Sequence, residues 1–489
     1  MRQVFEPLLR FDDKLIPQPA AADGYDVSTD GTLYTFHLRR DGRWSDGQPV
    51  TAQQFAFSWK RLLDPRLKAE YAPLFVDAGI VGADDFNTGR VATSAKVGVR
   101  AIDDYTFEVR LNQPFGALPD LAALWVGAPI RPDLVAADPD GWAQDPSTYI
   151  GNGPFMLSDW IHQDHLTLVP NPHYVAHASW PRPALSQVTV SMVSNPEDDY
   201  AAFKANQRDW TMVPDLEVNA VLNDPDLARQ ARQYSELTTF WVQVNTAQPP
   251  LDNVLVRRAL ARGIDRSALV RDLTAGLSIP TTSLIPPGMP GFEVGLGHEL
   301  SFDATGGRAL LAQAGLGESS ARTLSFSFPS TPAYLRRAEF LQSQWHDNLG
   351  LEVALNLMEA SEYERALEDG QYDLAFGGWS ADYPDPQDWF SALFGCEGAF
   401  NRTSYCNSTF DQVIARADTG SSLADRLRLY SQAHTMLTQD VPVLPLFVRG
   451  RLALVKPWVQ SIDGGPLPIT PADDYPGSFN LDRLQILPH

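Results

Sequence analysis

The chain has 489 residues, with 38 Lys or Arg against 60 Asp or Glu, which gives a formal net charge of −22. This acidity argues against nucleic-acid binding and against a polybasic membrane-surface role, because both need clustered basic residues. No apolar run approaches the about 18 residues that a membrane-spanning helix needs, so membrane insertion is not expected. The length allows about three globular domains of roughly 150 residues.

The N-terminal part predicts strands and a capped helix. Tyr34, Phe36 and Leu38 alternate with polar residues as in a half-buried strand, and Thr51 is placed to cap a helix that runs to Leu62. Residues 106–111 alternate in the same way. The first residues lack a basic stretch followed by an apolar one, so no signal peptide is expected in this chain.

Four of the nine histidines lie within 16 residues, at His162, His165, His173 and His177. A metal site is one interpretation of this cluster. Surface histidines are the other, and they are favoured because residues 170–172 carry two prolines that prevent a common helix. We therefore expect neither a metal nor a cofactor.

Residues 323–376 predict a β-α-β-α-β unit. Leu324, Phe326 and Phe328 alternate as in a strand, a helix is expected from Pro332 to Leu349, and two further strands and a helix follow up to residue 376. Such units form parallel sheets with right-handed crossovers.

Three other segments are predicted from their periodicity. A long helix is expected over 254–273, although Gly263 weakens its middle, and another helix over 423–437. Residues 441–448 contain two prolines, so they are expected to form only an edge or irregular strand.

The leading candidate site is the segment that follows the last strand of the unit, residues 377–386. Ligands of open α/β sheets bind beyond the carboxyl ends of the strands. Gly377 and Gly378 allow a close main-chain approach, Trp379 offers an apolar wall and Asp382 supplies a negative charge. Asp382 and Asp385 are also a candidate carboxylate pair for a hydrolase, although an aspartate beside proline and glycine more often stabilises a turn.

The only two cysteines are Cys396 and Cys406. They are two unrelated buried thiols or a disulfide that closes a short loop. The disulfide is favoured because two cysteines with none left over are typical of exported proteins.

Six motifs together resemble the oligopeptide-binding proteins, the extracytoplasmic solute-binding components of peptide ABC importers. The residues that carry the resemblance are Trp44–Ala52 with its continuation to Pro65, Gly151–Phe155, Asn171–Tyr174, Val256–Leu260, Gly378–Tyr383 and Val455–Trp458. They follow one another in order over nearly the whole chain.

The resemblance implies an α/β, two-lobed, periplasmic-binding-protein-like fold with three domains that are discontinuous in sequence. It assigns residues 1–5, 130–238 and 457–489 to a lobe I domain, 6–129 to an extra domain II, and 239–456 to domain III in lobe II. The chain joins the family pattern at the segment that enters the second domain. We therefore expect the N-terminal strands of lobe I to be missing.

The resemblance also implies the roles of site residues. Asp382 matches the aspartate that pairs with the α-ammonium of a peptide, and Gly378 and Ser380 match positions whose main chain pairs with the peptide as an added strand. Trp379 lies in the same motif. Tyr71, Trp241 and Asn245 are further pocket candidates by position, with core packing an equal alternative.

A non-catalytic peptide receptor in the periplasm or another extracytoplasmic space is therefore the expected function. Its partners would be a peptide and the membrane permease of an ABC importer, and a monomer is expected. Other solutes on the same fold, namely a dipeptide, an oligosaccharide, a nickel complex or haem, are the first alternative. The carboxylate-pair hydrolase is the second.

Overall fold

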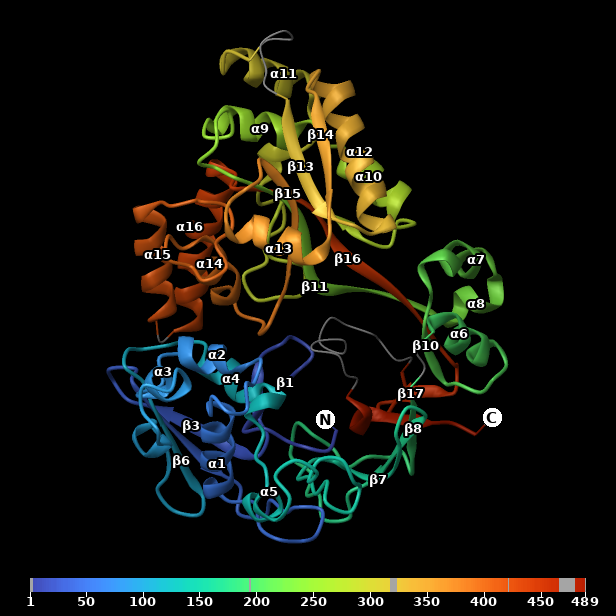
Figure 1. Ribbon diagram of the computed structural model, residues 1–489. Coiled ribbons are helices and arrows are strands. Elements are labelled where there is room, and N and C mark those ends of the chain that lie inside the picture. The colour runs from blue at the N-terminus through green and yellow to red at the C-terminus, as the bar shows by residue number, and fades with distance from the viewer. Residues whose placement is uncertain (1–2, 193–194, 317–322, 421, 466–479, 489) are drawn as a thin grey trace.

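The computed structural model describes residues 3–192, 195–316, 323–420, 422–465 and 480–488 (Figure 1). The described residues form a mixed α/β architecture with several separate sheets, so the predicted class is confirmed. None of the described helices combines the length and the apolar character needed to cross a bilayer. Parts of the expected lobe I and domain III, residues 1–2, 193–194, 317–322, 421, 466–479 and 489, lie outside the described residues.

An antiparallel sheet in the order β3-β4-β6-β5 forms the body at the lower left of Figure 1. Helix α1 packs on it and begins at the predicted cap, where the main-chain N–H of Thr51 donates to Gln54 Oε1 at 2.7 Å. The elements of this body are β1 Leu9–Phe11, β2 Pro17–Pro19, β3 Ala22–Val27, β4 Leu33–Leu38, α1 Ala52–Leu62, α2 Ala72–Asp77, α3 Ala83–Asn87, β5 Val99–Ala101, β6 Thr106–Arg110 and α4 Leu118–Ala123.

Two smaller antiparallel sheets, β7-β8-β9 and β17-β18, lie beside this body near both chain ends (Figure 1). Their elements, with the helix that precedes them, are α5 Pro132–Ala137, β7 Phe155–Ile161, β8 His165–Pro170, β9 Val188–Ser191, β17 Val459–Ser461 and β18 Leu484–Ile486. Short 3-10 helices connect several elements: η1 Ser94–Lys96, η2 Trp125–Gly127, η3 Asp215–Glu217, η4 His298–Leu300 and η5 Leu481–Arg483.

The largest sheet has the order β10-β16-β11-β15-β13-β14, with β12 on β16. Strand β13 is parallel to both β14 and β15, which confirms the predicted β-α-β-α-β unit. Its strands are β10 Trp210–Met212, β11 Ala231–Val244, β12 Ile279–Pro280, β13 Leu324–Pro329, β14 Val353–Met358, β15 Leu374–Ser380 and β16 Val443–Val455. The helices around it are α6 Pro196–Lys204, α7 Val218–Asn223, α8 Pro225–Gln230, α9 Val254–Arg262, α10 Arg266–Leu273, α11 Ala304–Gln313, α12 Pro332–Leu349, α13 Ala360–Glu368, α14 Gln387–Phe394, α15 Ser408–Asp418 and α16 Leu423–Asp440.

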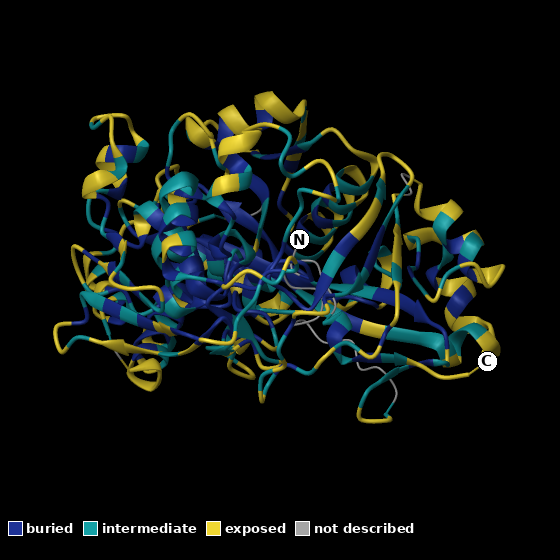
Figure 2. Ribbon diagram, turned by 90° about the horizontal axis from the view of Figure 1, so that it is seen from below, coloured by how far each residue is buried: buried dark blue, intermediate teal, exposed yellow. Residues whose placement is uncertain are grey.

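Helix α12 shows how local signals fix this unit. The Thr331 hydroxyl accepts the main-chain N–H of Tyr334, Pro332 occupies the first turn, and Gly350 ends the helix with φ +70°. Its inner face buries Leu341 and Trp345 against β13 and β14. Figure 2 shows the resulting pattern, with buried strands inside and exposed outer faces on the helices.

Of the two alternatives expected for residues 441–448, the irregular strand is confirmed and the edge strand is wrong, because β16 is an internal strand with register shifts in its pairing with β11. Pro445 is tolerated because it lies at a register shift, opposite Trp241 of β11. The carbonyl of Pro445 still has a hydrogen-bond partner, because it accepts the Nε–H of the buried Arg266 at 2.5 Å.

The expected long helix over 254–273 is two helices, α9 and α10. The chain breaks at Gly263, where a Cβ would lie 2.6 Å from Leu349 of α12. Asp265 then caps α10 by accepting the main-chain N–H of Ala268 at 3.0 Å. The low helix propensity of Gly263 indicated a weak point, and the close approach of α12 explains why only glycine fits where the helix ends.

Strands β11 and β16 are long, with 14 and 13 residues, and run from β10 to β15 (Figure 1). Their pairing is interrupted between Ser235 and Thr239, where the register shifts. The expected domain boundary at 238/239 thus falls inside β11, at an irregularity of its pairing. The division into three domains stays a prediction.

Helix α16 and the segment before α14 share a buried ion pair next to the first body. Arg426 of α16 donates to Asp385 at 2.7 Å, and both side chains are almost fully buried. The same arginine donates to the carbonyl of Ala417 at 3.1 Å. A main-chain hydrogen bond of 3.0 Å from Gly116 to Asp418 joins this region to the first body.

We predict that Arg426→Ala lowers the stability by about 3–5 kcal/mol, because Asp385 would remain buried without its cation. The matched control is Arg428→Ala on the same helix, since Arg428 is exposed and only 3.9 Å from Asp425. Thermal unfolding by circular dichroism measures both variants. Equal shifts in the two variants would contradict the prediction.

Candidate ligand-binding site

The last strand of the parallel unit, β15, is paired along only part of one edge. Strand β11 pairs with it from Leu374 to Ser380, whereas β13 pairs only with Leu374 and Ala375. Among the described residues, no strand pairs with the β13-facing edge from Gly377 to Ser380. An edge of this kind can accept an added strand.

The phase of the hydrogen bonds decides which residues face this open edge. The N–H of Ala381 donates to the carbonyl of Leu237 at 2.9 Å, so Ala381 points its main chain toward β11. Because direction alternates along a strand, Trp379 and Gly377 also face β11, and Gly378 and Ser380 face the open edge. These two are the residues that the sequence resemblance selects for main-chain binding.

The two glycines of the motif are required by β11. A Cβ on Gly377 would lie 2.6 Å from Trp241 Nε1, and a Cβ on Gly378 would lie 2.7 Å from Phe240 Cδ1. The sequence interpretation assigned these glycines to ligand approach. In the structure, these glycines leave the space that the side chains of Trp241 and Phe240 of β11 occupy beside β15.

Asp382 follows β15 and is half-buried. Among the described residues, no cation pairs with its carboxylate and no hydrogen bond to it is formed. Burial raises the pKa of Asp382, and the negative charge of Glu70 raises it further. Glu70 precedes α2 in the first body, so the two carboxylates come from different parts of the molecule (Figure 1). The arrangement is an unpaired anionic group that a cation would stabilise.

A second carboxylate, Asp388 of α14, holds the segment in place. Its Oδ2 accepts the indole N–H of Trp379 at 2.9 Å and the main-chain N–H of Asp382 at 3.0 Å. Burial raises the pKa of Asp388 strongly, and the neighbouring charge of Asp382 adds to this effect. Asp388 therefore positions both Trp379 and Asp382 through hydrogen bonds.

Trp379 is also supported from the side. Its ring lies 5.2 Å from that of Phe400, centroid to centroid. Phe400 belongs to the loop that the Cys396–Cys406 disulfide closes, with the two Cα atoms 4.5 Å apart. On the strand, the Ser380 hydroxyl shares a 2.8 Å hydrogen bond with Thr238 of β11.

Asp385 does not join Asp382 in an open site. It is buried, with an exposed fraction of 3%, and its Oδ1 accepts both Arg426 Nη2 and the main-chain N–H of Gln387. The sequence hypothesis of a carboxylate pair is therefore not supported by the positions of these two groups.

The remaining candidates by position are less accessible. Trp241 is 3% exposed and packs edge-on against Trp389, and Asn245 is 2% exposed with Nδ2 bonded to the carbonyls of Gly370 and Tyr372. Tyr71, beside Glu70, packs edge-on against Trp125 and is partly exposed. Roles for these three residues in ligand contact stay predictions.

The rings of three of the four histidines, His162, His165 and His177, have separate partners. His162 lies 3.2 Å from the carbonyl of Gln144, His165 pairs with Asp164 at 2.9 Å, and His177 accepts the main-chain N–H of Ser179 at 3.3 Å. Within the described ranges, no group of His, Cys, Asp or Glu has the proximity of a metal site.

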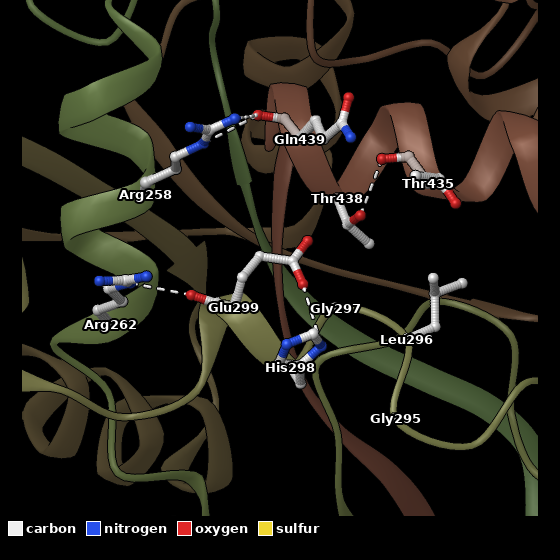
Figure 3. Close-up of a pocket in the computed structure, with 10 residues that line it drawn as sticks. All are labelled: Arg258, Arg262, Gly295, Leu296, Gly297, His298, Glu299, Thr435, Thr438 and Gln439. Carbon is white, nitrogen blue, oxygen red and sulfur yellow. Dashed lines mark hydrogen bonds and ion pairs between the residues drawn. The ribbon is translucent and has the colours of Figure 1, made fainter.

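A cavity of about 480 Å³ lies elsewhere, between α9, α16 and the loop before α11 (Figure 3). Its arginines are occupied by main-chain carbonyls: Arg258 donates to Gln439 at 2.7 Å and Arg262 donates to Glu299 at 2.9 Å. None of the candidate binding residues predicted from the sequence lines it, although Arg258 of the Val256–Leu260 motif does, so we do not place the main site there.

Sequence reasoning missed Asp388 and Glu70. Asp388 could have been found, because an aspartate directly before Trp389 and Phe390 in an apolar helix indicates a buried carboxylate that needs hydrogen-bond partners. Glu70 carries no such signal, since its proximity to Asp382 depends on how two distant segments pack.

Comparisons with known proteins found similarity over most of the chain. Residues 17–401 match the family model "Bacterial extracellular solute-binding proteins, family 5 Middle". The chain is 30% identical to the oligopeptide-binding protein OppA of Bacillus subtilis, over 91% of this chain and 82% of that protein.

Two solved structures are similar to this chain over nearly its full length. The unliganded open form of the murein tripeptide-binding protein MppA has a TM-score of 0.89, at 26% identity, over 100% of this chain and 92% of that one. OppA of Haemophilus influenzae with the peptide RPPGFSPFR has a TM-score of 0.70, at 26% identity, over 99% and 93%. The whole-chain TM-score is thus higher for the unliganded open form than for this peptide complex.

We predict that Gly378→Ala destabilises the protein by about 1–3 kcal/mol, because the new Cβ would overlap Phe240 and the carbonyl of Thr239. The matched control is Gly24→Ala in strand β3, where a Cβ would meet nothing within 4 Å. Thermal unfolding distinguishes the two, and an unchanged midpoint for Gly378→Ala would show that β11 does not require this glycine.

Proposed function

Because the chain belongs to family 5 of the bacterial extracellular solute-binding proteins, we propose that it binds peptides between two lobes and delivers them to the permease of an ABC importer. The peptide leaves unchanged, since the family consists of substrate-binding transport proteins. The observation that carries the proposal is the unpaired carboxylate of Asp382 at the end of the open β15 edge.

The two features supply complementary parts of the binding energy. The main chain of Gly378 and Ser380 can pair with an extended peptide whatever its side chains are. Asp382 can bind the α-ammonium by a charge-assisted hydrogen bond, which fixes the register of the peptide on the strand. Broad side-chain tolerance with a defined amino end follows from this combination.

Closure of the lobes would complete the site. Glu70 already acts electrostatically on Asp382 from the opposite body, and the ammonium of a peptide would relieve the repulsion between them. Ligand binding would therefore favour the closed arrangement through the differential affinity that any ligand-driven closure requires.

The other roles follow from the family. We propose an extracytoplasmic or periplasmic location, a monomeric receptor and direct contact with the membrane permease. The three-domain division, with 6–129 as domain II and 239–456 as domain III, is part of this proposal.

Other solutes remain the alternative on the same fold. A dipeptide would use Asp382 in the same way, whereas an oligosaccharide, a nickel complex or haem would not need it, because none of them presents an ammonium group. The response of binding to the charge of Asp382 therefore separates these ligand classes.

We predict that Asp382→Asn weakens the binding of tetraalanine at pH 7 by about tenfold or more, since the ammonium would lose its charged partner. Isothermal titration calorimetry measures the affinity. The matched control is Asp347→Asn on α12, an exposed position that should leave the affinity unchanged.

Equal affinity of the wild type and Asp382→Asn would remove Asp382 as the ammonium anchor. Native mass spectrometry of the purified protein, followed by denaturation, provides an independent check. Release of peptide masses is expected, whereas a co-purified sugar, metal chelate or haem would replace the peptide proposal.

The pKa of Asp382 also predicts a pH dependence. Only the ionised carboxylate binds an ammonium, so affinity falls as pH drops through the pKa of the free protein. Because this pKa is raised, the loss begins at higher pH than for an ordinary aspartate. Glu70→Gln removes the repelling charge, so we expect its affinity loss to begin at lower pH.

Calorimetry with tetraalanine between pH 7 and pH 4 tests this shift. Glu362→Gln, on the exposed first turn of α13, is the matched control and should follow the wild type. A Glu70→Gln curve that overlays the wild-type curve would show that Glu70 does not act on Asp382.

A further inference from the structure

The cavity between α9, α16 and residues 295–299 differs in charge from the molecule as a whole (Figure 3). Arg258 and Arg262 line it, and Glu299 is the only carboxylate among the described residues that do so. The whole chain, in contrast, has a net charge of −22. A cavity with two guanidinium groups and one carboxylate in so acidic a protein is a local attraction for an anion.

Both arginines are held by the protein, but each keeps N–H donors that no described residue accepts. Arg258 donates from Nε and Nη2 to the carbonyl of Gln439, at 3.1 and 2.7 Å. Arg262 donates from Nε to the carbonyl of Glu299 at 2.9 Å and from Nη1 to Asp303 at 3.5 Å. Among the described residues, no acceptor is bonded to Nη1 of Arg258 or to Nη2 of Arg262. The carbonyls thus fix both side chains and leave donors for a ligand.

The spacing of the two arginines suits one shared oxyanion. Residues four apart in a helix lie on one face, and their Cα atoms are about 6 Å apart along the axis at 1.5 Å per residue. Figure 3 shows the two side chains one above the other on α9. Guanidinium N–H groups form their strongest hydrogen bonds with charged oxygens, so a carboxylate between them would be bound from both sides.

The size and the other wall of the cavity favour an organic ligand. Figure 3 shows Leu296 and Thr435 on the side opposite the two arginines, where an apolar group can pack on the Leu296 side chain and the Thr435 methyl group. The volume of about 480 Å³ lies within the roughly 300–1,000 Å³ that is typical of small-molecule sites.

This cavity is separate from the open edge of β15. None of the residues that line it belongs to β11, to β15 or to the segment 381–386 that follows β15. A ligand in the cavity would therefore contact neither Asp382 nor the main chain of Gly378 and Ser380.

Glu299 opposes the two arginines. Its Oε2 atom lies 3.6 Å from Nδ1 of His298, whose side chain is largely exposed. In the part of the chain that the structure describes, the Glu299 carboxylate forms no ion pair with an arginine or a lysine. Its negative charge should repel an anion that Arg258 and Arg262 attract, so changes at Glu299 and at the arginines should shift anion affinity in opposite directions.

We propose that this cavity is a second binding site, for a small organic acid with one carboxylate and an apolar body. The carboxylate accepts hydrogen bonds from Nη1 of Arg258 and Nη2 of Arg262, and the apolar body packs on Leu296 and Thr435. This site goes beyond the proposed peptide binding and does not depend on it.

Two probes of nearly equal shape test the proposal: 4-fluorobenzoate and its uncharged counterpart 4-fluorobenzamide. Fluorine NMR titration of the whole protein at pH 7 measures both affinities. We expect the acid to bind about tenfold or more tightly than the amide, because only the acid is a charged acceptor for the two guanidinium groups. Equal affinities for the two probes would overturn the proposal.

Two variants assign this binding to the cavity. Arg262→Gln should weaken the binding of the acid about tenfold, whereas Glu299→Gln should strengthen it about threefold, and neither should change that of the amide. Glu299→Gln removes no hydrogen bond of the Glu299 main chain, so it keeps the test valid if Arg262→Gln lowers the unfolding temperature. Unchanged affinity of the acid in Glu299→Gln, or in a folded Arg262→Gln, would overturn the proposal.

The matched controls are Arg271→Gln and Glu293→Gln, which change exposed residues outside the cavity and should follow the wild type. Tetraalanine in excess tests whether the sites are separate, and it should leave the binding of the acid unchanged. Displacement of the acid by tetraalanine would place it in the peptide site, which would overturn this proposal and leave the proposed function intact. Absence of tetraalanine binding, in contrast, would count against the proposed function alone.

Discussion

The pairing of β11 with β16 is the constraint on which the binding region depends. These two strands connect the part that carries β10 with the part that carries β13 to β15, and their register shifts between Ser235 and Thr239. Thr238, in the interruption, is also the residue opposite Ser380 of the open edge. A change in the angle between the two parts would therefore act directly where the ligand is expected to pair. An irregular pairing bends more readily than a regular ladder, so it offers a physical basis for the lobe closure proposed above.

The charged residues of the chain fall into two groups, those that stabilise the fold and those that are free to bind a ligand. Charges that hold the fold, such as Arg426 with Asp385, are paired and buried. Asp382, at the end of the β15 edge, lacks such a partner among the described residues.

The sequence was sufficient where signals are local. Thr331, Pro332 and Gly350 define α12, and alternation defines the strands of the parallel unit, so the loop after β15 could be placed at the sheet edge that binds ligands. It failed where packing decides. The internal position of β16 depends on a register shift that accommodates Pro445, and the proximity of Glu70 to Asp382 depends on the packing of two distant segments. Neither distant pairing nor a missing counter-ion is visible in a linear pattern.

The alternation of main-chain directions along β15 has a consequence for the guest molecule. Only Gly378 and Ser380 turn their polar groups outward, two positions apart, so only every second residue of an extended guest can exchange hydrogen bonds with the strand. Proline or an N-methylated residue lacks the N–H that a facing position must donate. The protein would thus accept such residues at alternate places and reject them in between, and it would sort its cargo by backbone chemistry while remaining indifferent to most side chains.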